Sequence, residues 1–137
     1  QSYQETVAFA ASESGERGGR LIDDEWVQLN LARVRAGLDF LRLINWKVAS
    51  SSQLDIGDAS TIKIFGTEFY LESFRLLMEI IGPRAYLARN SAAEALHGRM
   101  EMNFRSLLIL TFGGGTNEIQ RDLIGMFGQR LPRALRS

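Results

Sequence analysis

The sequence predicts an all-α protein, an antiparallel bundle of about four to five helices. Apolar residues recur with helical spacing along nearly the whole chain, and no stretch shows the sustained alternation of a strand. The prolines, Pro83 and Pro132, both stand where an expected helix has already ended. Since the connections between these segments are short, consecutive helices should run antiparallel. We expect residues 1–137 to form a single domain.

Composition narrows the class of protein. A helical chain of 137 residues can bury a substantial core. Its 16 basic and 16 acidic residues cancel, which argues against a nucleic-acid or membrane partner. Cysteine is absent, so disulfides and thiolate chemistry are excluded. No apolar run approaches the roughly 20 residues of a membrane span, and no signal peptide opens the chain, so we expect a cytoplasmic protein.

The chain opens with Gln1, inside an expected first helix. We interpret it as the C-terminal part of a longer chain; a trimmed small protein is the alternative. The first helix carries Tyr3, Val7 and Ala10 and should end at the glycine-rich residues 14–19.

A second helix should start near Asp23 or Asp24, either of which can cap it, and end at residues 50–52. It carries two apolar stripes. One consists of Val27, Leu31, Val34, Leu38, Leu41 and Val48, and the other of Trp26, Leu29, Ala36, Phe40 and Leu43. Two stripes predict a helix that is covered on more than one side and therefore central.

The third helix should begin around residues 58–60 and end at Ile81, because Gly82-Pro83 cannot continue it. We expect a connecting stretch at residues 84–90. Ser91 to Glu94 form a capping-box pattern that should open a fourth helix, which runs to about Leu110.

Residues 113–115, three consecutive glycines, then break the fourth helix. Thr116 or Asn117 should cap a last helix that ends at Gly128, before an extended tail at 131–137. The side chains of this helix expected to point inward are Ile119, Leu123, Met126 and Phe127.

Two clusters of titratable residues have both a catalytic and an ordinary interpretation. Glu94 and His97 have the Glu-x-x-His spacing of di-iron bundles, but such a site needs a second motif and His97 is the only histidine. We therefore expect no metal, and a surface or interface position for His97. Glu68, Glu72 and Glu79 could align for acid–base work, although a solvated face shared with Arg75 and Lys63 is favoured.

The loop Gly113 to Thr116 is the strongest candidate site. Its glycines allow the backbone to approach a ligand, and the free amides of a following helix can bind anionic or carbonyl oxygens. A phosphate loop of the nucleotide-hydrolase kind is excluded, because no lysine follows the glycines. The alternative is an ordinary helix C-cap.

The full sequence around this loop, Gly-Gly-Gly-Thr-Asn-Glu-Ile-Gln-Arg-Asp-Leu-Ile at residues 113–124, resembles the signature of acyl-CoA dehydrogenases. Residues 128–133 are similar to the usual end of bacterial members, and residues 61–68 and 78–83 to the helix that precedes the flavin and substrate loop. The resemblance covers essentially the whole chain and identifies it as the family's C-terminal helical bundle. The N-terminal helical domain and the middle β-domain are not in the sequence.

This resemblance implies α,β-desaturation of an acyl-CoA thioester with FAD as cofactor. A carboxylate removes the α proton while the β hydride passes to flavin N5. It assigns Thr116 and Glu118 to flavin contact, and Glu79 and Gly82 to the flavin of a neighbouring subunit in a homo- or hetero-oligomer. Gly114 and Gly115 would contact the acyl-CoA.

Two departures qualify the assignment. Gly114 stands where many members have the glutamate base, so no catalytic residue is assigned in this chain; its amide could still hold the thioester oxygen. Other members place the base at a position that would lie before Gln1. The Arg-x-x-Phe-Gly segment that binds flavin pyrophosphate is also missing, with only Arg17 and Arg20 near its place.

These departures resemble heteromeric actinobacterial members that act on steroid side chains, in which a partner subunit supplies the base. We expect this chain alone to be inactive. The alternatives are a non-catalytic subunit that completes a partner's flavin site, and a stand-alone helical interaction module whose loop is similar by accident.

Overall fold

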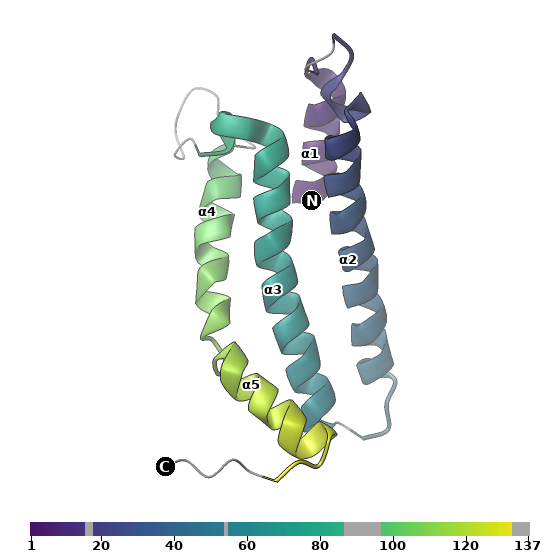
Figure 1. Ribbon diagram of the computed structural model, residues 1–137, viewed down its shortest axis with the longest axis vertical. Helices are drawn as coiled ribbons and strands as arrows, with labels where there is room; N and C mark the ends of the chain where they lie inside the picture. Colours follow the sequence, from purple (N-terminus) through teal and green to yellow (C-terminus); the bar gives the residue numbers. More distant parts are fainter. Residues whose placement is uncertain (16–17, 54, 87–96, 133–137) are drawn as a thin grey trace.

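The computed structural model describes residues 1–15, 18–53, 55–86 and 97–132 (Figure 1). Within them the α-helices are α1 (Ser2–Ser12), α2 (Glu25–Ala49), α3 (Ile56–Ile81), α4 (His97–Leu108) and α5 (Asn117–Leu123). Short 3₁₀ turns are η1 (Leu21–Asp23), η2 (Gly82–Tyr86) and η3 (Ile109–Thr111), and the π-helical turn η4 (Ile124–Gly128) continues α5. In these ranges the only β pairing is an isolated bridge between Ser14 and Arg20, which confirms the all-α prediction.

Helices α1 to α4 alternate in direction, and α3 occupies the middle of the molecule (Figure 1). It runs antiparallel to α2 on one side and to α4 on the other, while α1 lies beside the first half of α2. At the opposite end α5 packs across the beginning of α3. No helix in the described part of the chain is long and apolar enough to cross a membrane.

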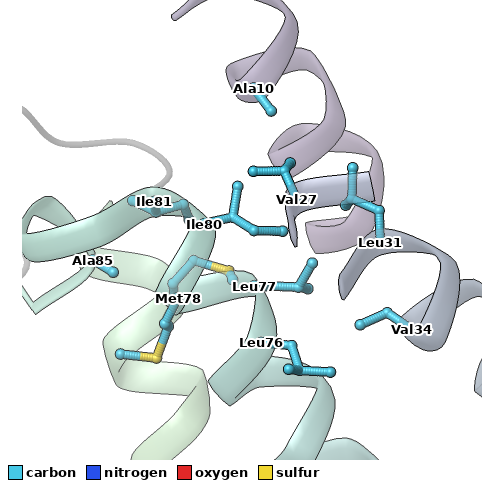
Figure 2. Packing of buried hydrophobic residues seen from close by; sticks show 11 residues of the cluster. Ala10, Val27, Leu31, Val34, Leu76, Leu77, Met78, Ile80, Ile81 and Ala85 are labelled. Atoms are coloured by element: carbon cyan, nitrogen blue, oxygen red, sulfur yellow. The ribbon is translucent and has the colours of Figure 1, made fainter. Parts of the chain in front are cut away.

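The core lies at the end of the bundle where α1, the start of α2 and the end of α3 meet (Figure 2). Its members are aliphatic side chains from each of these helices and from η2 and α4. They are Ala10, Val27, Leu31, Val34, Leu76, Leu77, Met78, Ile80, Ile81, Ala85 and Met100. Burial of such side chains stabilises the fold by about 1.5–3 kcal/mol each.

The second half of the α2–α3 contact is aromatic. The Phe69 ring lies directly on the backbone of α2 at Gly37, where a Cβ would fall 2.0 Å from the ring. Phe65 stacks beside Phe69 with ring centroids 5.6 Å apart and meets the edge of Phe40 at 4.6 Å. A side chain at residue 37 would separate the two helices, so the glycine sets their spacing.

The prediction that α2 is central is wrong for this chain. The first stripe of α2 faces the core, and Val27, Leu31 and Val34 are buried. The second stripe is largely open to solvent, with Phe40 49 % and Leu43 68 % exposed. Hydrophobic periodicity identified both stripes correctly but carries no information about which of them this chain covers.

Several helix ends differ from their predicted positions. The third helix starts at Ile56, two residues earlier than expected, because the Asp55 carboxylate accepts the Gly57 N–H at 2.6 Å. The stretch expected as a connection begins as the helical turn η2, since a proline is tolerated in the first turn of a helix.

The second helix begins at Glu25, with Asp24 at the predicted N-cap position, but the Asp24 side chain makes no capping hydrogen bond there. The capping box at residues 91–94 lies outside the described residues, as does most of the tail. On the last helix, Leu123 and Met126 are half-buried, but Ile119 is 45 % and Phe127 51 % exposed. The expectation that all four side chains point inward is wrong for Ile119 and Phe127.

Candidate functional site

The glycine loop lies between η3 and α5, beside the first half of α3 (Figure 1). Gly114 has φ +72° and Gly115 φ +96°, a left-handed backbone that residues with a Cβ rarely adopt. A Cβ built on Gly114 would meet no atom within 4 Å. The tip of the loop is therefore shaped by its glycines and has open space beside it.

Side chains hold two consecutive carbonyl groups of this loop. The Gln120 amide donates to the Gly114 carbonyl oxygen at 2.7 Å. The Lys63 ammonium, which comes from α3, donates to the Gly115 carbonyl oxygen at 2.8 Å. The loop is thus fixed from within its own helix and from the neighbouring one.

Asn117 connects the loop further to α3. Its side-chain oxygen accepts a second hydrogen bond from the Lys63 ammonium at 2.7 Å, and its amide nitrogen donates to Glu68 at 3.2 Å. Arg121 forms an ion pair with the same Glu68 carboxylate. Asn117 is 8 % exposed, so its amide is buried and satisfied on both sides, which fixes its orientation.

Thr116 caps α5, which selects one of the two caps expected from the sequence. Its hydroxyl oxygen accepts the Ile119 N–H at 3.3 Å. Hydrogen bonds from the backbone N–H of Glu118 itself, and then from the Thr116 hydroxyl, lower the pKa of the Glu118 carboxyl. Glu118 therefore carries a negative charge beside the loop at neutral pH.

Large apolar side chains surround the loop without being buried. Ile109 and Phe112 are each 67 % exposed on the approach to the glycines. Leu108 and Leu110 are exposed beside them in the sequence, and Ile119 is exposed on α5. Exposed apolar groups gathered around one loop mark a binding surface more often than an ordinary helix end.

Glu79 and Gly82 are not brought together with the loop. They lie at the far end of α3, so the helix separates Gly82 from Lys63 by roughly 28 Å at about 1.5 Å per residue. Glu79 is exposed and lies 3.8 Å from Arg75. Gly82 has φ +71° and ends the helix. Within one chain, Glu79 and Gly82 therefore lie in a different region of the surface from the loop.

Of the three carboxylates considered in the sequence, two lie on a solvated face and one takes part in the contacts that hold the loop. Arg75 pairs with Glu72 at 2.7 Å and with Glu79 at 3.8 Å, as expected of a solvated face. Glu68 is exposed too, but it belongs to the contacts that hold the loop. Lys63 points to the loop, so its assignment to the solvated face is wrong.

The remaining candidates are His97 with Glu94, and Arg17 with Arg20. His97 begins α4, while Glu94 and Arg17 lie outside the described residues. In the part of the chain that the structure describes, no group of three or more His, Cys, Asp or Glu side chains could hold a metal. Arg20 forms a two-point ion pair with Asp23, with both bonds at 3.0 Å.

Sequence analysis missed Lys63, Asn117 and Gln120 as residues that shape the loop. Lys63 had one available signal, since it is one of only two lysines and interrupts an apolar run between Ile62 and Ile64. Its partners are more than 50 residues away, so no local motif connects them.

Comparison with known proteins agrees with the loop and the fold. The family pattern described as acyl-CoA dehydrogenase, C-terminal domain, matches residues 1–128. Acyl-CoA dehydrogenase FadE26 of Mycobacterium tuberculosis is 53 % identical over 97 % of this chain and 35 % of its own length. The chain thus spans about a third of this relative.

Solved structures give the same result. A chain of the ChsE4-ChsE5 complex from Mycobacterium tuberculosis matches with a TM-score of 0.91 and 53 % identity, over 98 % of this chain and 35 % of that one. The Tcur3481-Tcur3483 steroid acyl-CoA dehydrogenase matches with a TM-score of 0.84 and 32 % identity, over 96 % and 34 %. The chain belongs to the acyl-CoA dehydrogenase family, as the C-terminal helical domain.

Proposed function

We propose that this chain is the C-terminal domain of a flavin-dependent enzyme that desaturates an acyl-CoA thioester between its α and β carbons. Its loop 113–116 would contact FAD and the acyl-CoA, and its outer helices would build the oligomer. The observation that carries this proposal is the loop itself: its family signature adopts a glycine-dependent shape, anchored by Lys63 and Gln120. A mere helix end would not need contacts from two helices.

The residues present fit a bound flavin at this loop. Gly114 leaves open space where any other residue would place a Cβ, so a flat ring or a thioester can approach the backbone. When bound, the flavin supplies the acceptor for the β hydride. Thr116 and Glu118 are the residues of this chain that we assign to flavin contact, and Gly114 and Gly115 those for acyl-CoA.

Glu79 and Gly82 suit a different flavin. They lie at the opposite end of α3 from the loop, so we assign them to a different flavin from the one at the loop. A neighbouring subunit whose flavin reaches this end of the bundle would use them. This arrangement requires an oligomer.

The outer face of α2 supplies a surface for such an assembly. Leu43 and Trp46 are 68 % and 67 % exposed, and Leu29 is 51 % exposed on the same helix. Large exposed apolar patches mark interfaces in soluble proteins. We assign this face to contact with another subunit.

A second candidate function follows from Gly114. The residue has no side chain that could remove the α proton, so the base must come from elsewhere in the full-length chain or from a partner subunit. The printed descriptions of two relatives name complexes of two different proteins. In that case this subunit completes a partner's flavin site without its own base. The match over residues 1–128 disfavours an unrelated helical module.

The substrate class proposed here is a CoA thioester with a bulky, steroid-like acyl group. One relative is described as a steroid acyl-CoA dehydrogenase, and a glycine at residue 114 leaves more space than a glutamate would. Ile109 and Phe112, which are exposed on the segment before the glycines, offer apolar contact.

The test is Gly114→Glu in the assembled, flavin-loaded, full-length protein. Flavin bleaching is followed on addition of octanoyl-CoA, and a steroid side-chain CoA thioester is titrated in parallel. We expect the glutamate either to add bleaching by the straight-chain substrate or to abolish steroid thioester binding. Gly114→Ala is the control, because it carries the same backbone strain without the carboxylate. If bleaching and affinity in Gly114→Glu match both the control and the wild type, residue 114 is not at the site.

A further inference from the structure

Lys63 is a charged residue at a half-buried position of α3. It lies half-buried in α3 between apolar neighbours, where a lysine is expected only if its ammonium is paired. Both of its hydrogen bonds reach the loop: one to the Gly115 carbonyl oxygen at 2.8 Å and one to the Asn117 side chain at 2.7 Å. Its role therefore concerns the loop rather than the core.

The bond to Gly115 determines the direction of the next amide. In a trans peptide the C=O and the following N–H point to opposite sides of the chain. Because Lys63 draws the Gly115 carbonyl toward α3, the Thr116 N–H points away from α3. Gln120 holds the preceding carbonyl, that of Gly114, so a side chain holds each of the two consecutive peptide planes.

The backbone N–H of Thr116 matters because the hydroxyl of this residue is already engaged. The hydroxyl oxygen accepts the Ile119 N–H at 3.3 Å, and hydrogen bonding from the same hydroxyl is one cause of the lowered pKa of the Glu118 carboxyl. A hydrogen bond from Thr116 to a ligand would therefore come from its backbone N–H. The orientation of that group depends on the peptide that Lys63 holds.

We propose that Lys63 is a positioning residue, which fixes the Gly115–Thr116 peptide so that the Thr116 amide is presented to the flavin. The inference rests on the proposed function of the loop, but it assigns a role to a residue on another helix. Asn117 supports the same arrangement, since its amide is buried between Lys63 and Glu68.

The test compares Lys63→Met with Lys47→Met in the full-length, assembled protein. These are the two lysines of the chain, and Lys47 is exposed at the end of α2. The measurements are the dissociation constant of FAD, the visible absorption spectrum of the bound flavin, and the melting temperature. For Lys63→Met we expect FAD to bind about tenfold more weakly, which equals about 1.4 kcal/mol, with a shifted flavin band. Lys47→Met should match the wild type in its FAD affinity and in the spectrum of the bound flavin.

A purely structural role would lower the melting temperature and leave the spectrum of the bound flavin unchanged, which would overturn the proposal. If Lys63→Met does not fold, Lys63→Gln replaces it, because its amide can still donate one of the two bonds. We expect an intermediate loss of FAD affinity and a shifted band; wild-type affinity and spectrum would refute the inference. If Gly114→Glu alters ligand binding while Lys63→Met and Lys63→Gln do not, this inference fails and the proposed function stands.

Discussion

Replacing Gly114 by alanine isolates the backbone conformation of the loop. The residue has φ +72°, and a Cβ there would meet no atom within 4 Å. The substitution therefore introduces no steric contact with other residues, and its whole native-state cost comes from the left-handed backbone. Gly113→Ala is the matched control, because residue 113 does not have a positive φ and its Cβ would lie 3.4 Å from the Ile109 carbonyl oxygen, an ordinary contact.

The magnitude follows from two opposing effects. A left-handed conformation costs an L-residue about 1–2 kcal/mol. Loss of glycine's freedom in the unfolded chain stabilises either variant by about 0.4–1 kcal/mol. We therefore expect Gly114→Ala to destabilise by up to about 1.6 kcal/mol and Gly113→Ala to stabilise by about 0.4–1 kcal/mol. The two variants should differ by about 1–2 kcal/mol.

Urea unfolding of the purified 137-residue chain, followed by circular dichroism, measures this difference. Equal midpoints for the two variants, or a more stable Gly114→Ala, would refute the left-handed conformation of residue 114. The same variants, made in the full-length protein, separate a cap from a binding loop. If Gly114→Ala weakens FAD or acyl-CoA binding while the protein remains folded, the loop holds a ligand.

Three further predictions concern the bundle and its charges. Gly37→Ala should destabilise the protein by about 1–3 kcal/mol in thermal unfolding, because its Cβ would fall 2.0 Å from the Phe69 ring. Its control, Gly66→Ala, should stabilise by up to about 1 kcal/mol, because that Cβ would lie 3.7 Å from Leu41. The isolated chain should sediment at micromolar concentration as a dimer or larger and Leu43→Asp should weaken this association; a monomeric wild type would contradict the assembly face. Because the pKa of Glu118 is lowered from 4.5, its stabilising effect relative to Glu118→Gln should be complete above pH 4.5 and disappear as the pH falls below it; a constant difference in urea midpoints would contradict this.

Local patterns were sufficient to predict most of the helices. The buried stripe of α2 and the stop at Gly82-Pro83 depend on residues close in sequence, and both are present in the structure. The sequence patterns failed to predict burial where it depends on which other segment packs against a side chain. Phe127 has the spacing of an inward residue on the last helix, yet no other part of the described chain covers it sufficiently, and it remains 51 % exposed.

The same distinction applies to the site. The glycines and Thr116 form one short segment, so the loop and its cap could be predicted from sequence. The contacts that fix the loop come from Lys63 and Glu68 on α3, about fifty residues earlier in the chain. Their significance depends on the packing of α3 against α5, which no sequence pattern in this chain specifies.

Amide hydrogen exchange of the full-length, flavin-loaded protein, with and without acyl-CoA, tests most directly whether the loop binds ligand. The peptide that spans residues 111–120 reports the loop, and a peptide from residues 25–35 at the start of α2 serves as internal control. We predict that acyl-CoA slows exchange in the first peptide and leaves the second unchanged. Unaltered exchange at residues 111–120, at a concentration where acyl-CoA is bound, would contradict the placement of the substrate at this loop.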